Sequence, residues 1–139
     1  ELVSGIVDSS KTTTVVFDSP GAATSSPPGQ NPNTTPSDAI VKFDPAYHSV
    51  NAEFNPSTGA VTNVPKIPAL VLGHELIHAT HRNEGTRDVS VKKYNGMDGV
   101  ERSNKVEEVR TVGLGFNKPN DITENQLREM LGVNPRNHY

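Results

Sequence analysis

Cysteine and tryptophan are both absent from the 139-residue sequence. Without cysteine the chain can form neither a disulfide nor a thiolate ligand for a metal, and it has no cysteine nucleophile. Any metal ligands must therefore be histidine, aspartate or glutamate. Aromatic residues make up 5% of the chain and hydrophobic residues 32%, which predicts a thin core that a bound metal could help to stabilise.

An excess of one charge and long apolar runs are also lacking. The formal net charge is -3 at pH 7 and no run of five basic residues occurs, so nucleic acid and membrane surfaces are not expected partners. No apolar run approaches the roughly 18 residues of a transmembrane helix, and the N-terminal residues lack the features of a signal peptide. We predict a single domain, residues 1–139, that acts as a monomer.

The first half of the chain has the character of short strands separated by turns. Residues 12–17 and 39–43 are rich in β-branched and aromatic types, and each is expected to form a strand. The two could pair as a long-looped hairpin, with the second strand as an edge strand that lines the substrate site. Between them, residues 18–38 are rich in proline, serine and threonine, which predicts a long mobile loop. A short strand is expected at residues 60–62.

The second half of the chain has helical patterns. Residues 68–80 combine good helix formers with apolar residues on several sides, as in a core helix. Residues 106–112 fit a second helix, because glycines follow them. Thr123 and Gln126 have the spacing of a capping box at the start of a third helix. The apolar stripe of that third helix is expected to consist of Leu127, Met130 and Leu131.

The sequence His74-Glu75-Leu76-Ile77-His78 is an H-E-x-x-H motif within the first predicted helix. Positions four apart lie one turn above each other, so His74 and His78 can present two imidazole nitrogens to one ion. The motif is typical of metalloproteases, in which the glutamate acts as general base. Composition alone would produce it about 0.01 times in such a chain, so accidental spacing is the weaker explanation. Apolar flanks also indicate a buried helix, where unligated polar side chains are costly.

A catalytic zinc usually has three protein ligands and one open position. The candidates for the third ligand are His81, Glu84, Glu107 and Glu108. A metzincin pattern would need glycine at position 81, so His81 breaks it and is expected to be structural or solvent-facing. On a helical wheel, Glu108 lies at the margin of the packed face of residues 106–112 and Glu107 lies farther out. Glu108 is therefore the predicted ligand, and Glu107 is either the alternative ligand or a group that supports the site.

Three segments, in this order, resemble signatures of the NleD-like effector zinc metallopeptidases. That family includes bacterial secreted effectors and C-terminal toxin domains of Rhs-type proteins. The segments are residues 71–79 around the H-E-x-x-H motif, residues 107–114, and an ending within residues 122–139. Three motifs in one order are far more specific than one, and together they extend over the second half of the chain.

The resemblance implies roles for particular residues. His74 and His78 would bind zinc, Glu75 would be the catalytic base, and a glutamate of the second signature would complete the site. Arg136 and Tyr139 could then stabilise the oxyanion that develops in peptide hydrolysis. The alternative for Tyr139 is a frayed chain end with no such role.

We therefore predict an α+β fold of the zincin kind, with a short β-sheet followed by a zinc-binding helix and C-terminal helices. The predicted function is that of a zinc-dependent endopeptidase with a protein substrate. The resemblance further implies a secreted effector or toxin that is delivered into a host or competitor cell, where signalling proteins are candidate substrates. Two alternatives remain: a zinc amidase acting on a non-protein amide, and a non-catalytic binding module with structural zinc.

Overall fold

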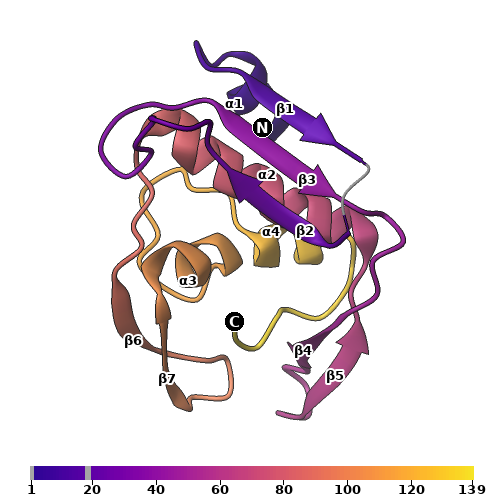
Figure 1. Cartoon of the computed structure of the whole chain (residues 1–139). Coiled ribbons are helices and arrows are strands. Elements are labelled where there is room, and N and C mark those ends of the chain that lie inside the picture. The colour runs from indigo at the N-terminus through magenta and orange to yellow at the C-terminus, as the bar shows by residue number, and fades with distance from the viewer. Residues whose placement is uncertain (1, 18–19) are drawn as a thin grey trace.

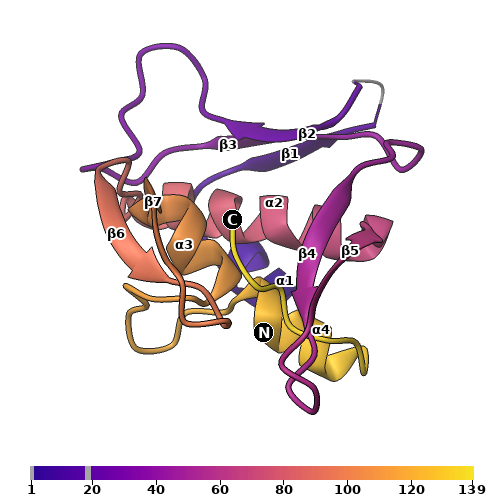
Figure 2. The same ribbon diagram turned by 90° about the horizontal axis from the view of Figure 1, so that it is seen from below.

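In the computed structural model, which describes residues 2–17 and 20–139, a three-stranded sheet covers one side of a long helix (Figures 1 and 2). That helix, α2, spans Pro68–Glu84. The strands of the sheet are β1 (Thr13–Val16), β2 (Ala22–Ser25) and β3 (Ala39–Phe43). The strand order is β1-β3-β2, and the central β3 pairs in parallel with β1 and antiparallel with β2.

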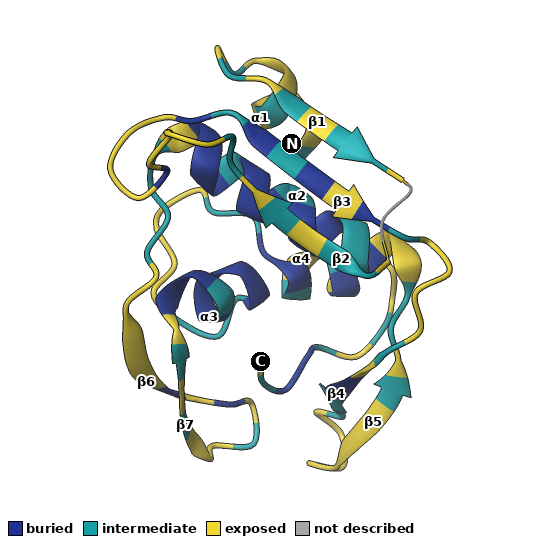
Figure 3. Ribbon diagram, in the orientation of Figure 1, coloured by how far each residue is buried: buried dark blue, intermediate teal, exposed yellow. Residues whose placement is uncertain are grey.

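The core lies between β3 and α2. Ala39 and Val41 are buried on the face of β3 that packs against Ala79 of α2. Proline opens α2 at a position where no backbone N–H is needed, and the helix ends at Gly85, which has a φ of 67° that a residue with a side chain rarely adopts. Figure 3 shows buried stretches on both α2 and β3. A helix that is buried on several sides can carry polar side chains into the interior.

Two antiparallel hairpins flank the C-terminal segment of the chain (Figures 1 and 2). One hairpin consists of β4 (Val50–Phe54) and β5 (Val61–Pro65), and the other of β6 (Val91–Asn95) and β7 (Glu101–Lys105). Asn137 links the two, because its backbone N–H donates to Ala52 of β4 and its carbonyl accepts from Met97 after β6. These backbone hydrogen bonds hold the C-terminal segment on the side of α2 away from the three-stranded sheet.

Three short helices complete the fold: α1 (Leu2–Val7), α3 (Val106–Val112) and α4 (Glu124–Met130). Figure 2 shows α3 and α4 on the side of α2 away from the three-stranded sheet. Thr123 and Gln126 form the predicted capping box at the start of α4. In the part of the chain that the structure describes, no helix has the length and apolar character needed to cross a membrane.

The predicted α+β fold class is confirmed, as are the strands near residues 12–17 and 39–43 and all three predicted helices. The hairpin prediction is wrong, because β1 and β3 run in parallel. β3 is also not an edge strand, since β2 lies on its other side. β2 itself falls within residues 18–38, which were predicted to form a loop, and it occupies an edge of the described sheet. Residues 18 and 19 lie outside the described residues.

The predicted apolar stripe of the last helix is wrong for two of its three residues. Leu127 is half-buried and lies against Gly73 of α2, but Met130 is 82% exposed and Leu131 is 55% exposed. Helix α4 also packs through Glu124 and Arg128, which are both buried and bound to each other by an ion pair of 2.8 Å. Burial of charged side chains is tolerated here because each has several hydrogen-bond partners.

Candidate metal centre

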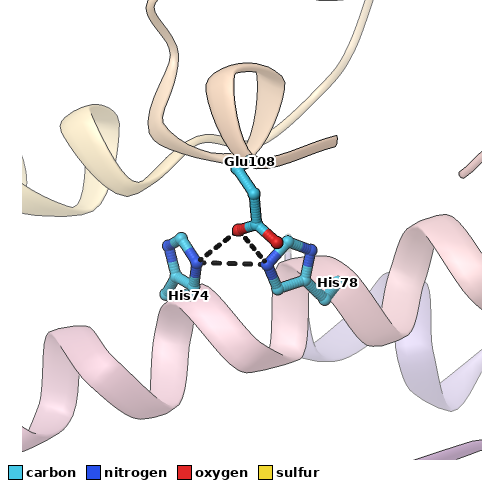
Figure 4. A group of neighbouring side chains, drawn as sticks. All are labelled: His74, His78 and Glu108. Carbon is cyan, nitrogen blue, oxygen red and sulfur yellow. Dashed lines mark hydrogen bonds and ion pairs between the residues drawn. The ribbon is translucent and has the colours of Figure 1, made fainter. Parts of the chain in front are cut away.

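Helix α2 presents His74 and His78 to α3, and Glu108 of α3 points back between them (Figure 4). The Nε2 atoms of the two imidazoles lie 3.1 Å apart. Oε2 of Glu108 lies 3.0 Å from Nε2 of His78 and 3.5 Å from Nε2 of His74. The structure therefore brings together the two histidines of the motif and the glutamate predicted as the third ligand.

These three atoms have the spacing of zinc ligands. Ligand atoms about 2.0–2.1 Å from a tetrahedral zinc lie roughly 3.3 Å from one another, and the observed separations of 3.0, 3.1 and 3.5 Å lie close to that value. Two imidazole nitrogens and one carboxylate oxygen are also ligands that zinc prefers. The donor set at His74, His78 and Glu108 therefore fits a zinc ion.

The other ring nitrogen of each histidine contacts a carboxylate. Nδ1 of His74 lies 2.9 Å from Oε2 of Glu124, and Nδ1 of His78 lies 2.7 Å from Oε1 of Glu107. A carboxylate accepts a hydrogen bond from a nitrogen that carries a proton. These contacts therefore favour the tautomer in which Nδ1 carries the hydrogen. Both Nε2 lone pairs then face the centre, where a cation between them removes their mutual repulsion.

The electrostatics of the centre also favour a cation. Burial alone would lower the pKa of His78, but hydrogen bonds and charge from Glu107 and Glu108 raise it to about 9. Burial would raise the pKa of Glu108, whereas its contacts with His74 and His78 lower the pKa well below the usual range. The negative charges of Glu107 and Glu108 thus lie beside the two imidazoles, where they would stabilise a divalent cation.

A second group of possible ligands, formed by His78, His81 and Glu107, lies directly behind the first. Oε1 of Glu107 lies 2.7 Å from Nδ1 of His78 and 3.0 Å from Nδ1 of His81. The shorter distance is that of a charge-assisted hydrogen bond and is too short for two ligands of one zinc ion. We therefore interpret Glu107 as an acceptor for two histidines.

The burial of Glu107 corrects the helical-wheel prediction that it lies farther out than Glu108. Glu107 is 1% exposed, and the side chain of Glu108 is 20% exposed. The inward position is possible because His78 and His81 both contact the Glu107 carboxylate. His81 is buried and has a structural position, while Glu84 is exposed and contacts Thr86.

Glu75, the predicted general base, follows His74 directly and is buried beside it. The hydroxyl of Thr24 lies 2.7 Å from Oε2 of Glu75 and 2.9 Å from the Glu75 carbonyl oxygen. Thr24 belongs to β2, so the edge strand of the sheet holds the side chain of the predicted base. Sequence reasoning missed Thr24 because it lies in a segment predicted to be a loop.

Arg136 and Tyr139 also reach the centre. The ring of Tyr139 stacks on that of His74, with centroids 5.7 Å apart and planes at 17°. The Arg136 guanidinium lies 4.5 Å from the centroid of the Tyr139 ring and donates to Glu124 at 3.0 Å. Burial, and then the charge of Glu108, raise the pKa of Tyr139, so its hydroxyl keeps its proton.

The position of Tyr139 has a structural basis. Its backbone N–H donates to the hydroxyl of Tyr94 on β6 at 3.2 Å. Arg136 forms an isolated bridge with Glu53 of β4. These contacts argue against the alternative of a frayed end, because both hairpins hold the segment. Sequence reasoning missed the contribution of Glu124, because its place directly after the N-cap Thr123 predicts a helix start but not an inward side chain.

Comparison with known proteins gives one family and a structural relative. The family model Peptidase_M91, described as "Effector protein", matches residues 6–139. Among solved structures, the light chain of botulinum neurotoxin serotype HA is similar, with a TM-score of 0.50 and 22% sequence identity. The similarity covers 86% of this chain and 31% of that one, so this chain spans about a third of the relative. No curated protein matches the sequence.

Proposed function

The chain belongs to the Peptidase_M91 family of effector proteins, whose model matches nearly its whole length, and we propose that it is a zinc-dependent endopeptidase. In this proposal the chain is a single-domain, monomeric effector that is secreted and delivered into a host or competitor cell. There it cleaves a protein substrate, and signalling proteins of the target cell are candidates. The observation that carries the proposal is the convergence of His74, His78 and Glu108 beside Glu75.

The number of donors favours catalysis over a structural role for the metal. Structural zinc sites usually have four protein ligands, whereas catalytic sites keep a position open. Among the residues that the structure describes, the group at His74 and His78 contains one further donor, Glu108. Glu75 follows His74 in the chain, and both residues line a cavity that opens beside the metal centre, so a carboxylate is available beside the open position.

In the proposed mechanism His74, His78 and Glu108 hold the zinc. Bound there, zinc would make a water molecule more acidic and polarise the carbonyl of the scissile bond. Glu75 accepts a proton from the attacking water and returns it to the leaving amine. Thr24 orients the Glu75 carboxylate through its 2.7 Å hydrogen bond.

Arg136 and Tyr139 have the chemistry to stabilise the oxyanion. Both line the cavity beside His74, and one offers a cationic guanidinium and the other a protonated hydroxyl. Donors that are already in position where negative charge develops stabilise the transition state more than the substrate. The contact of Arg136 with Glu124 pre-orients the guanidinium.

The test combines zinc loading with protein cleavage. Wild type and Glu75→Gln are each loaded with zinc and incubated with a mixture of cellular proteins, and new N-termini are mapped by mass spectrometry. We expect one zinc per chain in both proteins and cleavage by wild type alone, because glutamine accepts the Thr24 hydrogen bond but cannot take a proton. A chelator should abolish cleavage, and added zinc should restore it.

Glu84→Gln is the matched control, because Glu84 is an exposed glutamate on the same helix. It should cleave as the wild type does. Cleavage by Glu75→Gln at the wild-type rate would contradict the role of Glu75. Hydrolysis of small amides without any protein cleavage would favour the amidase alternative, and an effect on a partner that survives in Glu75→Gln would favour a binding module.

A further inference from the structure

A cavity of about 230 Å³ opens beside the metal centre, and its walls include Tyr47, Asn51, Lys66 and Ile67 as well as Glu75 and Arg136. We propose that this cavity is a specificity subsite in which Lys66 and Asn51 bind an acidic side chain of the substrate next to the scissile bond. The inference rests on the proposed peptidase function, since it assigns a substrate preference to the same site.

The position of the cavity fits a side chain near the scissile bond. It extends from His74 and Glu75 along the preceding turns of α2, past Val71 and Ile67, toward the β4–β5 hairpin. A substrate with its carbonyl at the metal centre would therefore place a neighbouring side chain in this cavity. The cavity also meets the first turn of α2, which contains no acidic residue and carries the positive end of the helix dipole.

Lys66 provides a positive charge that has no direct contact partner in the described chain. Its backbone N–H donates to Ser49 at 2.9 Å, which fixes the residue between β5 and α2. Its ammonium group forms no ion pair or hydrogen bond with any residue of the described chain. Burial, and then the charge of Arg136, lower the pKa of Lys66, although the charges of Glu124 and Glu75 act to raise it. A carboxylate in direct contact with the ammonium would offset the cost of its burial.

The two arginines of the cavity wall already have partners. Arg128 binds Glu124 and Glu53 at 2.8 and 2.6 Å. Arg136 also binds Glu124, at 3.0 Å. Among the lining residues that the structure describes, Lys66 is therefore the cation that has no ion pair and is left for an anionic ligand.

Asn51 supplies a hydrogen-bond donor to the same wall. Its Oδ1 accepts from Nη2 of Arg128 at 2.9 Å, which fixes the orientation of the amide because an arginine cannot accept. Nδ2 of Asn51 is then buried without a partner among residues 2–17 and 20–139. A carboxylate has two oxygens, so a substrate side chain that reached both groups could accept from the amide and from the ammonium together.

The test compares matched peptides with zinc-loaded enzyme. Cleavage sites of wild type are first mapped in a complex peptide mixture. One cleaved peptide is then synthesised with Asp or with its near-isostere Asn at each position within two residues of the scissile bond. At one position we expect kcat/KM to be about tenfold or more higher for the Asp peptide, as for a charge-assisted contact. Lys66→Met should reduce the ratio of kcat/KM for the Asp peptide to that for the Asn peptide to near one. Lys66→Glu should instead favour a peptide with Lys at that position.

Lys93→Met is the control, because Lys93 is an exposed lysine on the other hairpin and its removal changes the net charge equally. It should keep the wild-type ratio. An unchanged ratio in Lys66→Met, or a wild type without an acidic preference at any of these positions, would overturn the inference. Failure of zinc-loaded wild type to cleave any peptide or protein would instead contradict the proposed function, and the inference would fail with it.

Discussion

The carboxylate of Glu124 lies 2.9 Å from Nδ1 of His74, although 50 positions separate the two residues in the chain. The same oxygen of Glu124 accepts from Arg136, and its other oxygen accepts from Arg128. Burial would raise the pKa of Glu124, but the contacts with His74 and the two arginines lower the pKa well below the usual range. Helix α4 thus couples a predicted zinc ligand to the C-terminal segment.

Glu124→Gln should weaken zinc binding while leaving the three predicted ligands in place. Glutamine keeps the shape of the side chain but removes its negative charge. That charge orients the His74 ring and makes Nε2 a stronger metal ligand, so we expect zinc affinity to fall about 10- to 100-fold. Titration against a competing chelator measures this change. Glu129→Gln, an exposed change on the same helix, should leave the affinity unaltered. Equal affinities in all three proteins would show that Glu124 does not support the centre.

Thr24→Val should slow catalysis without loss of zinc. Valine has the shape of threonine but cannot donate to Glu75, so the carboxylate would lose its fixed orientation. We expect kcat to fall about tenfold, as when a charge-assisted hydrogen bond is removed. Thr24→Ser retains a hydroxyl and should keep most of the activity. If the valine variant turned over as fast as the serine variant, β2 would have no part in positioning the base.

Asp121→Asn should reveal a pH-dependent contribution to stability. The Asp121 carboxylate binds Arg110 through two contacts of 2.6 Å, and the Arg110 side chain is almost fully buried. Burial would raise the pKa of Asp121, but the hydrogen bonds from Arg110 lower it overall. The folded pKa therefore lies below the unfolded value of about 3.9, so this stability is present above about pH 4 and is lost as pH falls through the folded pKa.

Urea unfolding of wild type and Asp121→Asn across this pH range measures the contribution. Near neutral pH we expect the variant to be less stable by about 3 kcal/mol, because Arg110 would be left buried without its partner. The difference should shrink below about pH 4, where the wild-type carboxylate also becomes protonated. A difference that stays constant with pH would mean that the ion pair is not its source.

Gly85→Ala should destabilise the protein more than an ordinary glycine substitution. Gly85 has a φ of 67°, and a Cβ there would overlap the backbone of Thr35 and Pro36. Gly29 also has a positive φ, of 83°, but a Cβ there would meet nothing within 4 Å. Gly29→Ala should therefore show the conformational cost alone, and Gly85→Ala should lose about 1–3 kcal/mol more. Thermal unfolding compares the two, and equal losses would exclude the overlap as a cause.

The helical half of the fold was predictable because its signals are local. The H-E-x-x-H spacing places two histidines on one face of any helix, and the capping box of Thr123 satisfies its hydrogen bonds within four residues. Strand β2 was not predictable from the same kind of signal. Its residues, Ala22–Ser25, are small and polar, and their extended form depends on pairing with β3 and on the contact of Thr24 with Glu75.

Charged residues in the interior were the other limit of sequence reasoning. Glu107 and Glu124 are buried because histidines and arginines from distant segments bind them, and no local pattern contains that information. The β6–β7 hairpin was missed for a related reason. In β6 only Tyr94 is buried, so the strand lacks the alternation of apolar and polar residues that usually predicts one.

Anomalous diffraction at the zinc edge, from crystals of the zinc-loaded protein, would locate the metal directly. We predict one peak, about 2.0–2.2 Å from Nε2 of His74, Nε2 of His78 and a carboxylate oxygen of Glu108, with an open position on the side of Glu75. A peak bound instead by His81 and Glu107, or no peak near His74 and His78, would contradict this prediction.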